Sequence, residues 1–221
     1  MKKNVMMRLS ALLLVAVLLT TCVISGTFAK YVTTAPLKED SAKVAKWGIT
    51  MEITGADEVL NAKAGDADAT ASVLSNDLCA PGTYEELAKF TLSGQPEVAY
   101  KIEVTANLTL NNWTVDEDFY CPLVFGIGDT TINGLDYDNA TDLQDAVVAA
   151  IKTAISGDSS GAKTYNANAN AEKNVLIDWT WGFTGDDVKD TALGNAAVNP
   201  ANAATLAFNL QVTVTQVDHV A

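Results

Sequence analysis

Histidine, cysteine and basic residues are scarce in this 221-residue chain, and each shortage excludes a class of function. One histidine and three cysteines leave no HExxH metal-binding helix and no CxxC redox pair. The 14 lysines and arginines are outnumbered by 27 aspartates and glutamates, which gives a formal net charge of −13 at pH 7. Such a surface repels phosphate groups, so we expect no binding to nucleic acid or to anionic membranes.

Catalytic motifs are also missing. The sequence has no G-x-S-x-G nucleophile motif and no Gly-rich phosphate loop. A glycosidase carboxylate pair requires a separation that sequence cannot show. We therefore predict that the protein is not an enzyme and that it uses no cofactor or catalytic metal.

Long hydrophobic runs are confined to the first 29 residues. Three basic residues precede an apolar stretch from residue 9 to about residue 23, and small residues follow at 26–29. A basic start, an apolar middle and a small-residue end are typical of a secretory signal peptide. We predict that residues 1–29 form this leader and that cleavage separates Ala29 from Lys30.

Two alternatives to cleavage remain open. Residues 9–28 are just long enough to form an uncleaved transmembrane anchor. Lipidation at Cys22 is the other alternative, although Thr21 is an unusual residue directly before a lipidated cysteine. All three readings export the remaining chain, so we expect a location that is secreted, in an extracellular matrix or at the cell surface.

Four segments of the exported chain alternate apolar and polar residues with a period of two: 47–53, 98–110, 175–183 and 206–214. Alternation of this length predicts β-strands with one buried face and one solvated face. The buried faces must cover one another, which favours an all-β fold built as a two-sheet antiparallel sandwich.

One short helix interrupts this pattern. Apolar residues recur at intervals of four from Leu143 to Ile155, after Thr141 as a candidate N-cap and before Gly157 as a stop signal. We expect this helix to lie across one end of the sandwich. The polar segments 157–174 and 184–204 read as loops.

The sequence positions of the tryptophans predict core roles for two of them and surface contact for a third. Trp179 and Trp181 share a strand face with Ile177 and Phe183, which favours the core over a carbohydrate-stacking platform. Trp113 follows two asparagines and is the better candidate for surface contact.

Two cysteines follow the leader, Cys79 and Cys121. In an exported protein they could form a disulfide, which would stabilise the fold by roughly 4 kcal/mol through loop closure. The alternative is a pair of buried thiols that pack as small apolar residues.

Acidic residues gather at 116–118 and again at Asp136, Asp138 and Asp142. Their oxygens could bind Ca²⁺, but the second group lacks the distal glutamate of a calcium loop. We favour solvated loop carboxylates, and hence no metal site.

Several segments together resemble the TasA/camelysin (CalY) family of biofilm-matrix proteins from Gram-positive bacteria, whose leaders are removed by a SipW-type signal peptidase. These segments are "SGTFAKYVTT", "DSAKVAKWGITMEIT", "LCAPGTYEELAKFTLSGQPEVAYKIEV", "IDWTWGF", "DTALGN" and "LQVTVTQVD". The resemblance covers most of the exported chain and is weakest between residues 137 and 173. It implies a jelly-roll-like sandwich over residues 43–221 that polymerises into extracellular fibres.

The resemblance also implies that the freed N-terminal arm, residues 30–42, donates a strand to the next subunit. The donor strand would comprise Lys30, Tyr31, Val32, Thr33 and Thr34. Independently of any family, the residues at 31–34 favour strands, and Pro36 would end the pairing. Alternatively, the arm pairs within its own domain, or it frays.

The partners implied are further copies of the chain, a minor nucleating subunit and the signal peptidase, with no membrane contact once the leader is cut. The main rival function is a monomeric adhesion or glycan-binding module.

Overall fold

The computed structural model describes residues 32–35, 40–43, 48–55, 60–61, 72–73, 78–183 and 185–217, all within the unit Val32–Ala221. The expected leader, its cleavage residues Ala29 and Lys30, and Tyr31 lie outside these ranges. Within the ranges, no helix is both long and apolar enough to cross a membrane.

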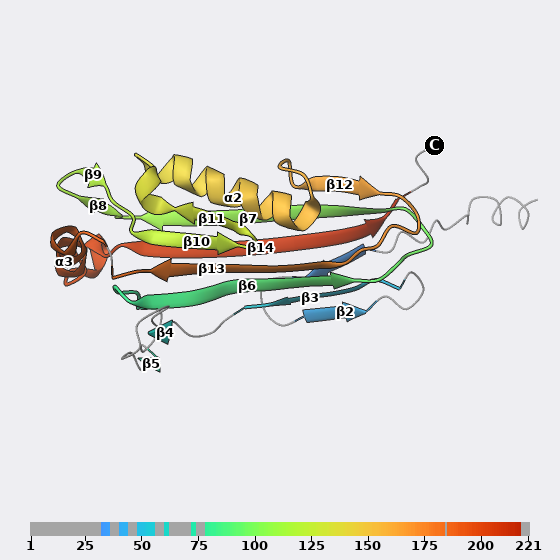
Figure 1. Ribbon diagram of the computed structural model, residues 1–221, viewed down its shortest axis with the longest axis horizontal. Coiled ribbons are helices and arrows are strands. Elements are labelled where there is room, and N and C mark those ends of the chain that lie inside the picture. Colours follow the sequence, from blue (N-terminus) through green and yellow to red (C-terminus); the bar gives the residue numbers. More distant parts are fainter. Residues whose placement is uncertain are drawn as a thin grey trace, which may run out of the picture. The chain divides into compact units, whose positions relative to one another are not determined.

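Two antiparallel sheets carry the fold, as predicted (Figure 1). The four-stranded sheet has the order β1 (Val32–Ala35), β14 (Thr205–Gln216), β7 (Tyr100–Asn111) and β12 (Ala162–Tyr165). The eight-stranded sheet has the main order β11 (Thr130–Asn133), β10 (Leu123–Ile127), β13 (Lys173–Trp181), β6 (Thr83–Ser93), β3 (Thr50–Thr54) and β2 (Asp40–Lys43). In addition, β4 (Leu60–Asn61) pairs with β6, and β5 (Ser72–Val73) pairs with β4. A small hairpin joins β8 (Thr114–Val115) to β9 (Asp118–Phe119).

Alternation of burial along the long strands confirms the predicted buried faces. In β7 the buried residues are Tyr100, Ile102, Val104, Leu108 and Leu110. Trp179 and Trp181 in β13 are 3% and 4% exposed, as expected for core residues. Phe183 does not follow them: it is 60% exposed, because β13 ends at Trp181 and the alternation ends with it.

Helix α2 (Ala140–Ser156) confirms the predicted helix, and its apolar stripe from Leu143 to Ile155 is fully buried. Asn139, rather than Thr141, is its N-cap, because the extended backbone of Asn139 lets its side chain accept a hydrogen bond from the Asp142 N–H. Gly157 ends the helix in the left-handed conformation.

The expected position of this helix across one end of the sandwich was wrong. α2 runs along a long side instead, where it contacts β7 of one sheet and β10 and β13 of the other (Figure 1). Its stripe of four apolar residues extends over several turns, and only a contact along the strands can bury a stripe of that length.

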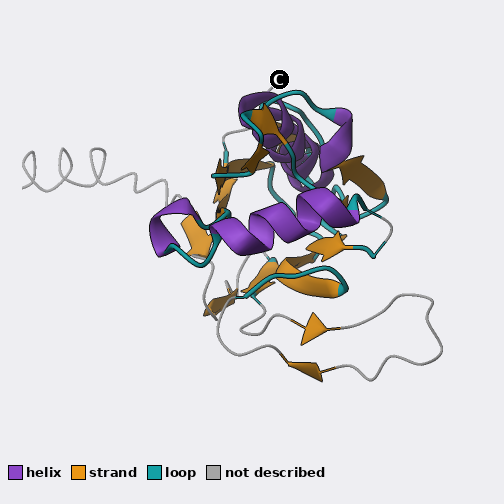
Figure 2. Cartoon of the chain, turned by 90° about the vertical axis from the view of Figure 1, so that its left-hand side faces the viewer, coloured by secondary structure: helices purple, strands orange, loops and turns teal. Residues whose placement is uncertain are grey.

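The prediction of one helix was also wrong, because residues 184–204 contain a second. Helix α3 (Asp187–Ala196) begins after Asp186, whose carboxylate accepts hydrogen bonds from the N–H groups of Val188 and Lys189. It lies across one end of the sandwich (Figure 2) and is followed by the 3₁₀ turn η2 (Pro200–Asn202). The segment 157–174, expected to be a loop, contributes β12.

The strands define two ends of the sandwich (Figure 1). The α3 pole comprises residues 78–83, 111–122, 133–142, 182–183 and 185–204, which include the 3₁₀ turn η1 (Gly134–Asp136). The β12 pole comprises residues 93–103, 156–173 and 216–217. β14 begins at the α3 pole and ends at the β12 pole.

Candidate functional site

The segment expected to donate a strand forms β1, the outermost strand of the four-stranded sheet. It pairs antiparallel with β14 of its own chain, with Val32 opposite Thr215 and Ala35 opposite Val212. Val32, Thr33 and Thr34 of the predicted donor strand therefore pair within the chain here, which is the first of the two alternatives considered for the arm.

β1 occupies only part of the edge that β14 presents. β14 pairs with β7 along all 12 of its residues, whereas β1 covers only Val212–Thr215. No other strand in the described ranges pairs with residues 205–211 on this side. In the part of the chain that the structure describes, main-chain groups of β14 at residues 205–211 therefore have no strand beside them on this side.

Burial along β14 changes where β1 ends. Leu210, Val212 and Val214 are at most 1% exposed. Leu206 and Phe208, which alternation places on the same face, are only half-buried. The sandwich is thus incompletely covered beside the unpaired stretch of β14, which we call the open edge (residues 205–211).

The arm contributes one strand to each sheet. After Ala35 the chain crosses to the eight-stranded sheet, where β2 pairs antiparallel with β3 and Lys43 lies opposite Thr50. Because β1 and β2 are both outermost strands of their sheets, each is held by pairing on one side only. Such strands are the ones most readily exchanged.

The two cysteines are free thiols in the structure, with Cys121 fully buried and Cys79 partly buried. Burial raises the pKa of the Cys79 thiol to about 11 and that of the Cys121 thiol to about 12. The nearby Cys79 thiol contributes to the higher pKa of Cys121. Both sulfurs are therefore protonated and poorly nucleophilic near neutral pH.

The predicted acidic groups lie on the surface at the α3 pole, where residues 116–118 and Asp136, Asp138 and Asp142 are all exposed. Within the described ranges, no cluster of three or more His, Cys, Asp or Glu side chains could hold a metal ion.

Trp113 was expected to contact partners at the surface, and this expectation was wrong. Its side chain is 1% exposed, its indole N–H donates to the Thr205 carbonyl at 2.9 Å, and its ring lies 5.7 Å from that of Trp181. Asn112 directly before it has a φ of 59°, a turn conformation that directs the chain back into the core.

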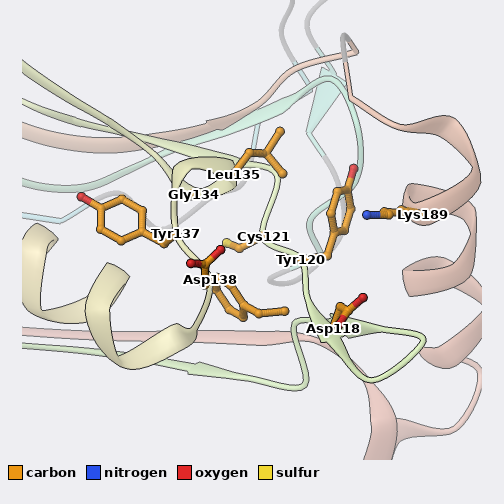
Figure 3. A pocket seen from close by; sticks show the side chains of 9 residues that line it. Asp118, Tyr120, Cys121, Gly134, Leu135, Tyr137, Asp138 and Lys189 are labelled. Atoms are coloured by element: carbon orange, nitrogen blue, oxygen red, sulfur yellow. The ribbon is translucent and has the colours of Figure 1, made fainter.

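A pocket of about 480 Å³ opens at the α3 pole (Figure 3). Its walls include Asp118, Phe119, Tyr120, Tyr137, Asp138 and Lys189. The Lys189 ammonium lies 5.2 Å from the centre of the Tyr120 ring, within the range of a cation–π contact. The pocket thus combines carboxylates with aromatic surface that already accommodates a cation.

Hydrogen bonds fix the wall formed by Tyr120. Its hydroxyl donates to Asp190 Oδ1 at 2.8 Å and accepts from the Asp186 N–H at 3.2 Å. Burial, followed by the hydrogen bond to Asp190, raises the pKa of Tyr120 to about 12. Sequence reasoning missed this site because residues 184–204 read as a loop, although Asp186 before a further acidic residue was a usable N-cap signal.

Comparisons with family models, with curated proteins and with solved structures found no match for this chain.

Proposed function

We propose that this chain is a secreted structural protein that forms extracellular fibres, of a biofilm matrix or of the cell surface, by exchanging its N-terminal strand after leader removal. The jelly-roll connectivity implied by the family resemblance is part of this proposal. The observation that supports it best is the pairing of β1 with only four residues of a 12-residue edge.

Exchange is chemically simple at this edge. The pairing of β1 consists of main-chain hydrogen bonds to β14, and the arm of a second copy can form the same bonds in the same register. The arm leaves its own domain at Lys43, so a swap requires rearrangement only of the residues before that point.

Strand exchange would also bury more of the open edge than pairing of the arm within its own chain does. Within one chain the arm must cross between the sheets after Ala35. Continuing the β1 register along a donated arm would bring Leu37 opposite Leu210, beyond an interruption of the main-chain hydrogen bonds at Pro36. The same register places Glu39 opposite Phe208 and Ser41 opposite Leu206. The added strand would pair with main-chain groups of residues 205–211 and would further cover the partly buried side chains of Leu206 and Phe208.

The leader would control the timing. While residues 1–29 precede the arm, the strand is tethered at the membrane; cutting between Ala29 and Lys30 by a SipW-type signal peptidase releases it. Donation from each copy to the next does not close on itself, so it produces a filament. The filament would consist of copies of this chain, started by a minor nucleating subunit.

The decisive experiment compares residues 30–221 with the same chain lacking residues 30–37, by electron microscopy and sedimentation. We expect fibres from the first and monomers from the second. Hydrogen exchange on residues 205–216 should show new protection in the fibres. Monomers from both chains would favour the rival function, a monomeric adhesion or glycan-binding module.

A further inference from the structure

The α3 pole carries a large uncompensated negative charge. Segments 111–122, 133–142 and 185–204 contain nine carboxylates and one lysine, Lys189. Within the described ranges, the one ion pair joins Lys101 to Glu103, at the opposite pole. These nine carboxylates therefore have no ion-pair partner in the described chain, and they repel one another.

The same pole also holds the exposed large apolar side chains. Five such residues occur in the described ranges, with exposures from 48% to 85%: Leu78, Leu135, Phe183, Val188 and Val198. All five belong to the α3 pole as defined above. Single exposed apolar residues are ordinary, but their concentration at one end is typical of a surface that meets another protein.

Among residues 78–217, the opposite pole carries most of the lysines. Residues 78–217 contain six lysines, and Lys101, Lys163 and Lys173 lie at the β12 pole. Lys152 reaches the same end, since its side chain lies against Gly161. Four carboxylates accompany these four lysines, so the β12 pole is nearly neutral while the α3 pole is strongly acidic.

The direction of the arm relates the two poles. Lys43 lies opposite Thr50 at the β12 pole, so an arm released from the chain would extend outward from that pole. The open edge of β14 begins at Thr205, at the α3 pole. An arm entering another copy from its α3 pole, with the N-terminus leading, runs antiparallel to β14, as β1 does.

We propose that the α3 pole docks on the β12 pole of the next copy, and that its pocket receives a lysine side chain from that pole. The Asp118 and Asp138 carboxylates, which line the pocket (Figure 3), would meet the incoming ammonium. The rings of Phe119 and Tyr137, which also belong to its lining, would pack on the methylene stem. The apolar side chains become buried around this contact. The inference rests on the proposed function, because the donated arm brings these two poles together.

Charge swapping in the processed chain, residues 30–221, tests the contact. One variant carries Asp118→Lys and Asp138→Lys, a second carries Lys163→Glu and Lys173→Glu, and a third carries all four substitutions. Lys89→Glu, on β6 between the poles, is the matched control. Thermal unfolding of each variant verifies that the fold is retained.

Sedimentation measures the concentration at which copies associate. We expect each two-residue variant to raise this concentration by about tenfold, because like charges then meet across the contact. For the four-residue variant, and for an equimolar mixture of the two-residue variants, the association concentration should lie within about threefold of that of the original chain. The Lys89→Glu control should leave it unchanged.

The outcomes separate this inference from the proposed function. Two results would overturn the contact between the α3 pole and the β12 pole and leave strand donation unaffected. One is that fibres form equally well in all variants, and the other is that the four-residue variant associates no better than the two-residue variants. A processed chain that forms only reversible dimers, with the same loss and rescue, would contradict the fibre proposal and support the contact. A chain that remains monomeric throughout would overturn both.

Discussion

The hydroxyl of Tyr120 donates a hydrogen bond to Asp190 at 2.8 Å, and this bond connects the segment after β9 to helix α3. The same oxygen accepts from the N–H of Asp186, the N-cap of that helix. Both Tyr120 and Asp190 are more than 90% buried. One phenol therefore holds together two segments 66 to 70 residues apart in sequence.

Replacing Tyr120 with phenylalanine should destabilise the protein. The change leaves the buried Asp190 carboxylate without this donor, which costs about 1–3 kcal/mol of unfolding free energy. Urea denaturation followed by tryptophan fluorescence measures the loss. Tyr84→Phe is the matched control, since its partly exposed ring should cost under about 0.5 kcal/mol. An equal loss in both variants would contradict the role given to the Tyr120 hydroxyl.

Alkaline pH should unfold the protein before its buried tyrosines ionise freely. The pKa values of Tyr100 and Tyr120 are raised to about 12 from an ordinary value of 10, in both cases chiefly by burial. A raised pKa means that the folded chain favours the neutral phenol, so this stability is complete below pH 10 and is lost as pH rises towards 12. Phenolate absorbance and circular dichroism should change together in that interval. Ionisation that leaves the fold intact would contradict this prediction.

Replacing glycine with alanine should lower the stability of the protein at the end of a helix and raise it in the middle of one. Gly157 has a φ of 78°, and an added Cβ would lie 2.8 Å from the Tyr165 hydroxyl, so Gly157→Ala should cost about 1 kcal/mol or more. Gly194 lies inside α3 with open space around it, so Gly194→Ala should stabilise the protein by up to about 1 kcal/mol. Paired thermal melts measure both effects. A destabilised Gly194→Ala variant would contradict the assignment of α3.

Asp178→Asn should stabilise the folded chain at neutral pH. Burial and the neighbouring Glu86 raise the pKa of Asp178, so its ionised form is less favourable in the folded state. Stability associated with a raised carboxyl pKa is complete below about pH 3.8 and falls as pH rises through the folded pKa. The asparagine variant should therefore melt at a higher temperature than the original at pH 7, and the difference should shrink below pH 4. A difference that does not vary with pH would contradict this account.

The thiols should react slowly until the chain unfolds. The pKa of Cys79 is about 11 and that of Cys121 about 12, so thiolate is scarce at pH 8. We expect iodoacetamide to modify the partly exposed Cys79 before the buried Cys121, and both to react rapidly in urea. Mass spectrometry of the alkylated peptides measures the order. Rapid modification of Cys121 in the native chain would contradict the burial seen here.

Strand periodicity was sufficient to predict the sheets, since long alternating segments such as 98–110 have few other ways to bury one face. The same reasoning found α2, whose apolar residues recur every four positions. It missed α3, in which Leu193 and Asp190 are the buried residues and most of the helix faces solvent. A helix with so little apolar periodicity is specified by its cap and by tertiary contacts.

The pocket and the open edge could not be read from sequence for a related reason. Tyr120 and Lys189 are 69 positions apart, and only the path of the chain brings them together. Leu206 and Phe208 obey the alternation of a buried face, yet they are half-buried because the neighbouring strand is short. The alternation of apolar and polar residues predicts which face of the sheet a side chain lies on. How deeply that side chain is buried depends on the lengths of the neighbouring strands.

Helix α2 has a consequence for the architecture of a fibre. It packs along one long side of the sandwich, against β7, β10, β11, β12 and β13, and so shields that side from incoming strands. The open edge of β14 lies on the other side. Under the proposed strand exchange, an incoming arm would therefore approach the sandwich from the side that α2 leaves uncovered.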